Sequence, residues 1–508
     1  MTFSDELKNY IKARYPLILV QTVEEDRLLT DIEKITKSLE HYLVTWSSVS
    51  GLKGKHIDFE NQEYTKNVET AIKACEKLAK LDKPAIFVFF DVSLSAYERE
   101  FKEFAINIRH KGYRCNCIII STSSDISKDI ASEVTVLDYP LPDRESIKKQ
   151  IKKFMDDYQD EEKAQIDTSP EVITALTDAA IGLTHAEIEN CLSRALVEDH
   201  CLDISDVKSI VKEKKQIIRK SGILEYIENS LSLEDIGGLD NLKYWLEIRG
   251  KTFSDDAQKF GLTAPKGVLL VGVPGCGKSL TAKCIAKAWN MPLLKLDIGK
   301  IYGKYIGESE ANIRQAIKTA EAIAPCVLWI DEIEKGLQND NDSGTSSRVL
   351  GNILTWMQDK TASVFTFATA NNITSLPPEL LRKGRFDEIF FVDLPDFEER
   401  KKILEIHIRK IGRDIKNYDL DKLAKLSGES NLGKNIRLTG AEIESWVKDS
   451  LLEAYVRKIN GESKSNLSMA DFEKVLKRMV PMAKMRMDDI NTIRNWAQEN
   501  AINASLKE

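Results

Sequence analysis

A glycine-rich segment in the second half of the chain carries the residue types that bind phosphate groups. It reads VGVPGCGKSL and contains the pattern GxxxxGK[ST] from Gly272 to Ser279. Glycines let backbone N–H groups approach phosphate oxygens closely, and a lysine placed here can reach the β- and γ-phosphates of a nucleotide. The hydroxyl of Ser279 can be a ligand of Mg²⁺. The residues expected to bind the phosphates are Gly272, Val273, Pro274, Gly275, Cys276, Gly277, Lys278, Ser279 and Leu280.

Two neighbouring carboxylates follow an apolar run further along the chain. Residues 326–330 predict a buried strand, and Asp331 and Glu332 come directly after it. Open α/β sheets bind ligands outside the carboxyl ends of their parallel strands, so acids at this place can take part in chemistry. We expect Asp331 to hold the Mg²⁺ shell and Glu332 to orient or deprotonate an attacking water.

A third apolar run, residues 364–368, is followed by polar side chains. Asn371 lies near its end, where an amide can contact a γ-phosphate or the water, and Arg382 and Arg385 come next, on either side of a glycine. Arginine suits the charge that develops on a transferred phosphoryl group. A surface turn with two solvated cations is the alternative that this motif leaves open.

The segments around these residues must form the elements that position them. Residues 268–271 predict a buried strand before the glycine-rich turn, and residues 280–289 predict an amphipathic helix after it. Strand, glycine-rich turn and helix is the context in which this pattern binds phosphates. The alternation of apolar strands with helical segments predicts an α/β fold with a parallel sheet, that is, a P-loop NTPase.

In this order the motifs resemble those of the AAA (AAA+) ATPases, over residues from about 231 to 471. The resemblance makes residues 272–279 the Walker A loop, Asp331 and Glu332 the Walker B pair, and Asn371 the first sensor. It implies ATP and Mg²⁺ as cofactors and a small helical lid after the α/β domain. The further nucleotide contacts that it implies are Asp235, Gly237, His407, Gly440 and Ala441.

The resemblance also implies an assembly of several subunits. Arg382 and Arg385 match the arginine fingers of the family, which act on the nucleotide of a neighbouring subunit in a ring that is expected to be a hexamer. Tyr305, Ile306 and Gly307 are similar to the family's first pore loop, which grips a polypeptide in the central channel. An exposed Tyr-Ile pair on a glycine-bounded loop favours this binding role, and packing of Tyr305 beneath the loop is the alternative.

The first half of the chain has no phosphate-binding segment but echoes the second. Four blocks recur in the same order, for example PAIFVFFDVS and PCVLWIDEIE, which predicts a duplicated module. Residues 22–26, TVEED, stand where phosphates would need glycines and a lysine, and Asp91 is followed by Val92, so we expect the catalytic glutamate to be missing. We interpret this half as a degenerate AAA-like module with a structural, recruiting or regulatory role. An independent adaptor domain of the same class is the alternative.

The domain boundaries follow from these motifs. We expect a degenerate α/β domain in residues 1–155, its helical lid and a linker in 156–220, the ATPase α/β domain in 221–395, a second lid in 396–470 and a helical segment in 471–508. Nearly the whole chain resembles the AAA-domain proteins of cyanobacteria and algal plastid genomes, a group described as a hypothetical chloroplast reading frame. That resemblance implies a soluble protein of the cyanobacterial cytoplasm or the plastid stroma.

Composition excludes several other classes of function. The formal net charge is −7, which argues against a dedicated nucleic-acid binder. No apolar run approaches the length of a membrane span, and the sequence lacks HExxH, so a membrane-bound zinc protease is excluded. The leading hypothesis is therefore an ATP-hydrolysing, ring-forming motor that remodels a protein substrate. The alternative is a nucleotide-gated switch or scaffold that binds a partner through the first half and threads nothing.

Overall fold

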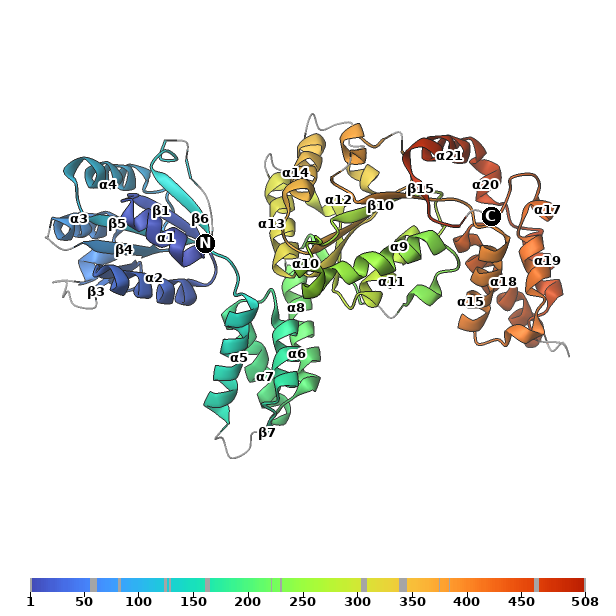
Figure 1. The fold of residues 1–508 in the computed structure, drawn as a ribbon, viewed down its shortest axis with the longest axis horizontal. Coiled ribbons are helices and arrows are strands. Elements are labelled where there is room, and N and C mark those ends of the chain that lie inside the picture. Colours follow the sequence, from blue (N-terminus) through green and yellow to red (C-terminus); the bar gives the residue numbers. More distant parts are fainter. Residues whose placement is uncertain are drawn as a thin grey trace. The chain divides into compact units, whose positions relative to one another are not determined.

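The computed structural model of the chain forms two compact units, Met1–Val207 and Lys208–Glu508, which are described one at a time (Figure 1). The described residues are 2–54, 62–80, 84–122, 126–127, 129–159, 165–220, 222–228, 231–302, 308–337, 345–373, 375–382, 384–460 and 466–506. Within these ranges, the structure contains no helix with the length and apolar character that crossing a membrane requires.

The first unit begins with a six-stranded sheet in the order β3-β2-β4-β5-β1-β6. Strand β3 pairs antiparallel with β2, and the other neighbouring pairs are parallel. Alternate residues of the central strands point to opposite faces, where α1 and α2 cover one core and α3 and α4 the other. The strands are β1 (Leu17–Gln21), β2 (Tyr42–Ser47), β3 (Gly51–Gly54), β4 (Ala85–Phe90), β5 (Cys115–Ser121) and β6 (Val134–Asp138), and the helices are α1 (Phe3–Lys12), α2 (Glu25–Leu39), α3 (Val68–Ala79) and α4 (Glu98–Lys111).

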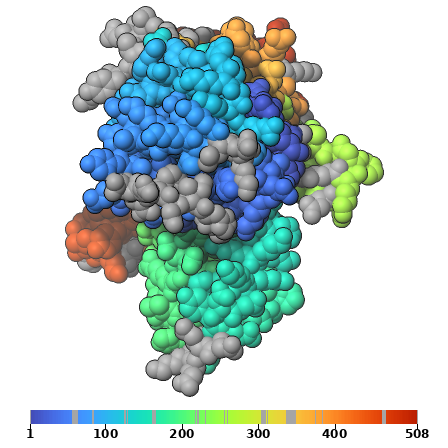
Figure 2. Space-filling model, turned by 90° about the vertical axis from the view of Figure 1, so that its left-hand side faces the viewer, coloured from blue at the N-terminus to red at the C-terminus, as the bar shows by residue number. Residues whose placement is uncertain are grey.

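A small helical lid follows this sheet in the first unit. Side chains cap the N-termini of its three helices: Asp143, Ser169 and Thr184 each accept a hydrogen bond from an N–H group in the first turn. Figure 2 shows the blue α/β part and the teal lid as separate lobes. The lid consists of α5 (Arg144–Tyr158), α6 (Pro170–Ala180) and α7 (His185–Asp199), with the short strands β7 (Gln165–Ile166) and β8 (Cys201–Leu202).

The second unit is built on a seven-stranded sheet in the order β15-β14-β10-β13-β12-β11-β9. Strand β9 pairs antiparallel with β11, and the other neighbouring pairs are parallel. The strands are β9 (Leu224–Tyr226), β10 (Gly267–Gly272), β11 (Leu293–Leu296), β12 (Cys326–Ile330), β13 (Val364–Ala370), β14 (Glu388–Val392) and β15 (Ile502–Asn503). The accompanying helices are α8 (Val207–Lys220), α9 (Asp240–Gly250), α10 (Asp255–Lys259), α11 (Lys278–Ala288), α12 (Ile298–Ile301), α13 (Glu308–Ala322) and α14 (Thr345–Asp359).

The two sheets share one topology over five strands. The order β14-β10-β13-β12-β11 in the second unit matches β6-β1-β5-β4-β2 in the first. Both sheets add an antiparallel strand beside β11 or β2, but β9 comes before β10 in the chain, whereas β3 directly follows β2. Both sheets are followed in sequence by a helical lid. The predicted fold class, a P-loop α/β module with a helical lid preceded by a degenerate copy, is confirmed by this arrangement.

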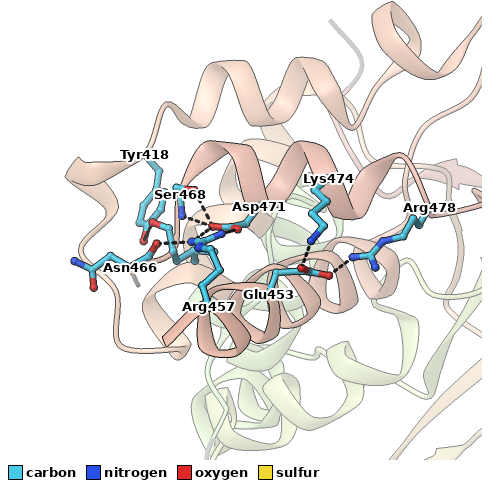
Figure 3. Close-up of polar contacts among 9 residues, drawn as sticks. Tyr418, Glu453, Arg457, Asn466, Ser468, Asp471, Lys474 and Arg478 are labelled. Carbon is cyan, nitrogen blue, oxygen red and sulfur yellow. Dashed lines mark hydrogen bonds and ion pairs between the residues drawn. The ribbon is translucent and has the colours of Figure 1, made fainter. Parts of the chain in front are cut away.

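The lid of the second unit is held together by ion pairs as well as by its core. Figure 3 shows Glu453 and Arg457 on α18 directed toward Asp471, Lys474 and Arg478. Asp471, in the first turn of α19, is buried and also accepts a hydrogen bond from the N–H group of the N-cap residue Ser468, so it caps α19 and joins it to α18. The lid helices are α15 (Phe397–Lys410), α16 (Leu420–Leu426), α17 (Glu429–Leu432), α18 (Gly440–Ile459) and α19 (Met469–Leu476).

The C-terminal segment differs from the helical prediction for residues 471–508. Helix α19 packs in the core of the lid, so we place the end of the lid after residue 476. Helices α20 (Met482–Met485) and α21 (Met487–Asn500) follow, and the chain then adds β15 to the sheet edge beside β14. Backbone oxygens of this C-terminal segment accept hydrogen bonds from α9, because Asn241 Nδ2 donates to Asn503 O and Leu242 N donates to Ala504 O. These bonds satisfy backbone polar groups at the edge of the sheet.

Candidate active site

The glycine-rich loop connects β10 to α11 in the second unit. A Cβ atom at Gly272 would lie 2.0 Å from the carbonyl oxygen of Val392 on β14, so this close approach of the two strands requires glycine. Helix α11 begins after Gly277, and no side chain caps it. Its first N–H groups are therefore open to a ligand, and an uncapped helix N-terminus preceded by a glycine-rich turn suits the phosphates of a nucleotide.

Lys278 lies buried at the start of α11 and points back toward the loop. Its Nζ donates to the carbonyl oxygens of Gly272 and Val273, both at 2.8 Å. Burial is the main cause that lowers the pKa of Lys278 to about 8. The ammonium group thus lies beneath the loop with backbone oxygens as its partners, where the negative charge of a phosphate would favour its protonated form.

The predicted metal ligands are in direct contact with each other. Ser279 Oγ donates to Asp331 Oδ1 at 2.9 Å, which joins the start of α11 to the end of β12. Mg²⁺ prefers oxygen ligands and is commonly held by one or two protein groups, with phosphates and waters completing the shell. This donor set fits Mg²⁺, although among the described residues no cluster of three or more His, Cys, Asp or Glu side chains could hold a metal ion.

Glu332 is held at both its backbone and its carboxylate. Its φ of +49° is in the left-handed region, and its N–H group donates to Thr369 Oγ1 at 2.9 Å. Its Oε1 accepts a hydrogen bond from Asn371 Nδ2 at 2.7 Å, and Lys335 forms an ion pair with the same carboxylate. Asn371 in turn donates its own N–H group to Glu334, a buried acid whose pKa is raised by burial.

These groups border a pocket of about 500 Å³. It contains most of the predicted residues: Asp235, Gly237, Pro274, Gly275, Cys276, Gly277, Lys278, Ser279, Leu280, Glu332, Asn371, His407, Gly440 and Ala441. Gly272, Val273 and Asp331 are not among the lining residues: Gly272 and Val273, at the start of the loop, accept the hydrogen bonds of Lys278, and Asp331 accepts one from Ser279. The described lining also includes Ile236 and Ile406, which adjoin the predicted Asp235 and His407, and residues that the sequence analysis missed: Leu231, Thr369, Ile403, Lys410 and Glu444.

The lid closes the far end of this pocket. Ala441 N donates to Gly275 O at 2.9 Å, which links the first turn of α18 to the phosphate loop. His407 on α15 is half-buried, and burial lowers its pKa, so the ring is neutral at pH 7 and can lie against a nucleobase. Lys410, one turn further along α15, forms an ion pair with Asp235 at 3.4 Å. The missed residues Ile403 and Lys410 lie four residues before and three residues after His407, a helical spacing that could have identified them.

The predicted arginine fingers and pore loop lie elsewhere. Arg382 and Arg385 are not among the described residues that line the pocket of their own chain. Arg382 is exposed, whereas Arg385 is partly buried and donates to the carbonyl oxygen of Glu379. Tyr305, Ile306 and Gly307 lie outside the described residues.

The matching region of the first unit corrects one interpretation of the sequence. Strands β4 and β12 each begin directly after a proline and pair with the neighbouring strand from their first residue. Counted from there, Asp91 corresponds to Glu332, and both have positive φ, +52° and +49°. Phe90 therefore stands where the second unit has Asp331. The first unit therefore lacks the aspartate that is predicted to bind Mg²⁺ in the second unit, and a shorter acid, Asp91, replaces the glutamate.

Glu24 occupies the loop of the first unit that corresponds to the phosphate loop. Its Oε1 accepts a hydrogen bond from the N–H group of His185 at 2.8 Å, and Oε2 forms an ion pair with Arg27 at 2.7 Å. His185 is the first residue of α7, so the carboxylate fastens the lid to the α/β part much as Gly275 does in the second unit. A pocket of about 760 Å³ lies here between α2, α5 and α7, with side chains of both charges around it.

Replacing Glu24 should reveal this fastening. We expect Glu24→Ala to lower the free energy of unfolding of the first unit by about 2 kcal/mol, because buried donors lose their acceptor. Burial raises the pKa of Glu24, so its contribution to stability is full below the unfolded pKa and declines as pH rises through the folded pKa. Glu24→Gln, which does not titrate, should therefore gain stability relative to the wild-type chain as the pH rises above about 4.5, the ordinary pKa of a glutamate. Native-state hydrogen exchange of the first unit measures the free energy of unfolding of both variants. A loss of stability of Glu24→Gln relative to the wild-type chain as the pH rises would contradict the prediction.

Comparison with known proteins agrees with this geometry. A model of the ATPase family associated with various cellular activities (AAA) matches residues 268–394. Models of SpoVK-like AAA ATPases match residues 3–139, as the N-terminal domain, and residues 145–221, as the second domain.

Full-length relatives are also similar to this chain. The uncharacterized AAA domain-containing protein ycf46 of Guillardia theta is 37% identical over 511 residues, covering 99% of this chain and 96% of the relative. The proteins of the same description from Trieres chinensis and Pyropia yezoensis are each 36% identical, covering 99% and 100% of this chain and 98% and 100% of the relatives. The similarity thus extends over both units.

Proposed function

The chain belongs to the AAA ATPase family, and on that premise we propose that it binds and hydrolyses ATP with Mg²⁺ at the pocket of the second unit. The observation that supports this most directly is the meeting of Ser279, Asp331, Glu332 and Asn371 at one end of that pocket. Phosphate release from ATP by the purified chain, with and without Mg²⁺, tests the proposal. No release above that of a Lys278→Ala variant would contradict it.

Each residue has a role that its position allows. The uncapped N-terminus of α11 and Lys278 would bind the phosphates, and Ser279 with Asp331 would hold Mg²⁺, which would neutralise charge on the phosphate oxygens. Glu332 accepts a proton from, or orients, the attacking water, and Asn371 keeps its carboxylate in place. At the other end, neutral His407 and the segment around Gly237 contact the base.

We propose further that subunits assemble into a ring and act as a motor on a protein substrate. Arginine fingers that lie outside the pocket of their own chain need a neighbour whose site they can complete. The resemblance of residues 305–307 to a pore loop supports a polypeptide as the substrate. The resemblance to plastid and cyanobacterial proteins supports the plastid stroma or the cyanobacterial cytoplasm as the place of action.

Tyr305→Ala separates the motor from its alternative. If the chain threads a polypeptide, this variant should keep ATP turnover within about twofold of the wild-type chain but lose unfolding of a substrate, because an aromatic anchor of the grip is removed. The change in fluorescence of a test protein as it unfolds measures the second activity, the unfolding of a substrate. If the chain is instead a nucleotide-gated switch that binds its partner through the first unit, Tyr305→Ala should not change partner binding. Neither the wild-type chain nor the variant should then unfold a substrate.

A further inference from the structure

The hydroxyl group of Thr369 contacts both acids of the candidate active site. It donates to Asp331 Oδ1 at 2.8 Å and accepts from the N–H group of Glu332 at 2.9 Å. Its side chain is on β13 and is 1% exposed. We propose that Thr369 is a positioning residue for ATP hydrolysis, which fixes the carboxylate of Asp331 toward Mg²⁺ and the backbone of Glu332 toward the attacking water. The inference rests on the proposed ATPase function.

One hydroxyl group is suited to this double contact. It offers a donor and an acceptor at the same atom, so a single side chain can orient a carboxylate and hold an N–H group. Asp331 Oδ1 receives hydrogen bonds from Thr369 and from Ser279. An oxygen held from two sides keeps its direction when the Ser279 hydroxyl turns to a metal ion, because the Thr369 bond remains.

Glu332 requires such support because of its backbone. A non-glycine residue in the left-handed region carries a conformational cost of about 1 kcal/mol, and neighbouring contacts must maintain it. Thr369 holds the N–H group of Glu332, and Asn371, two residues further along, holds its carboxylate. Thr369 on β13 and Asn371 just after it thus fix the backbone and the carboxylate of Glu332, the residue that is proposed to act on the water.

The first unit shows that the backbone turn itself does not need the hydroxyl group. Thr369 corresponds there to Ile120, and Asp91 keeps its positive φ while donating its N–H group to the carbonyl oxygen of Ile120 at 2.9 Å. Phe90 stands in place of Asp331 in that unit. The hydroxyl group is therefore absent where the metal-site carboxylate is absent, which supports a role in positioning the acids over a role in forming the turn.

The test compares Thr369→Val, which keeps the shape and loses the hydroxyl group, with Thr369→Ser, which keeps it. Thr366→Val is the matched control, because Thr366 is a buried threonine of the same strand whose Oγ1 accepts from Lys360. We expect Thr369→Val to lower kcat by about 10²-fold and leave the KM for ATP within about threefold, as misplacement of catalytic groups does. Thr369→Ser should recover most of kcat, and Thr366→Val should leave it unchanged.

A second measurement does not depend on turnover. The Mg²⁺ concentration that half-saturates binding of a fluorescent ATP analogue should rise about tenfold in Thr369→Val, because an outer contact of a metal ligand is removed. A folded Thr369→Val chain with wild-type kcat and an unchanged Mg²⁺ midpoint overturns the inference. If the wild-type chain releases no phosphate, the proposed ATPase function fails, and the Mg²⁺ midpoint alone decides whether Thr369 orients Asp331.

Discussion

Glu332→Gln should bind ATP as the wild-type chain does and hydrolyse it at least about 10²-fold more slowly. An amide cannot accept the proton of the attacking water, yet it has nearly the same shape as the carboxylate. Lys278, Ser279 and Asp331, which are proposed to bind the phosphates and Mg²⁺, are untouched. Affinity for a fluorescent ATP analogue and phosphate release measure the two effects separately.

The same pocket offers a matched control for this variant. Glu444 lines the pocket from α18 and shows no hydrogen bond to Ser279, Asp331 or Asn371. Glu444→Gln should therefore change the affinity for ATP at most and leave kcat within about threefold, since Glu444 interacts with His407, on the side of the pocket that is proposed to bind the base. If Glu332→Gln retained the wild-type rate of phosphate release, the assignment of the active site would be wrong.

Glu332→Gln, which should retain bound ATP, also tests whether the chain assembles into an oligomer. ATP remains bound to Glu332→Gln because it is not consumed, so an oligomer that needs ATP should accumulate. Light scattering of this variant with and without ATP measures the mass. A persistent monomer with ATP bound would remove the mechanism in which one chain completes the site of its neighbour.

Residues close together in sequence were predictable, because their geometry is local. The glycine-rich turn places Lys278 and Ser279 on the first turn of a helix whatever surrounds it, and a strand end places Asp331 beside them in any sheet with this strand order. The α/β fold followed from the same alternation of apolar runs and helical segments, and it is confirmed.

Other features depended on packing that no short pattern records. Ile403 and Lys410 reach the pocket only because the lid packs back against the sheet. Thr369 could not be distinguished from an ordinary strand residue, since threonine is common in strands. The position of Asp91 was misjudged because β4 is apolar on both faces, so alternation gave no register. Strand β15 spans only residues 502–503, too few for any periodic signal.

Arg382→Ala should lower ATP turnover of the assembled protein by about 10³-fold, with little effect on ATP binding. Arg382 is exposed and lies outside the pocket of its own chain, so a side chain that acts on phosphate must reach a neighbour's site. Arg385 differs, because it is partly buried and bonded to Glu379 O, and Arg385→Ala should also reduce the thermal stability of the second unit. Phosphate release and thermal unfolding of both variants separate the two roles.

Mixing two inactive variants tests whether the action is between chains. An Arg382→Ala chain has an intact Glu332, and a Glu332→Gln chain has an intact Arg382, so each can supply what the other lacks only across an interface. In a random ring of equal parts, about a quarter of the sites combine both groups, and the mixture should recover about that share of wild-type turnover. The double variant mixed with Arg382→Ala provides no intact arginine and should recover none. A mixture as inactive as its parts, while the wild-type ring forms normally, would mean that Arg382 does not act on the neighbouring site.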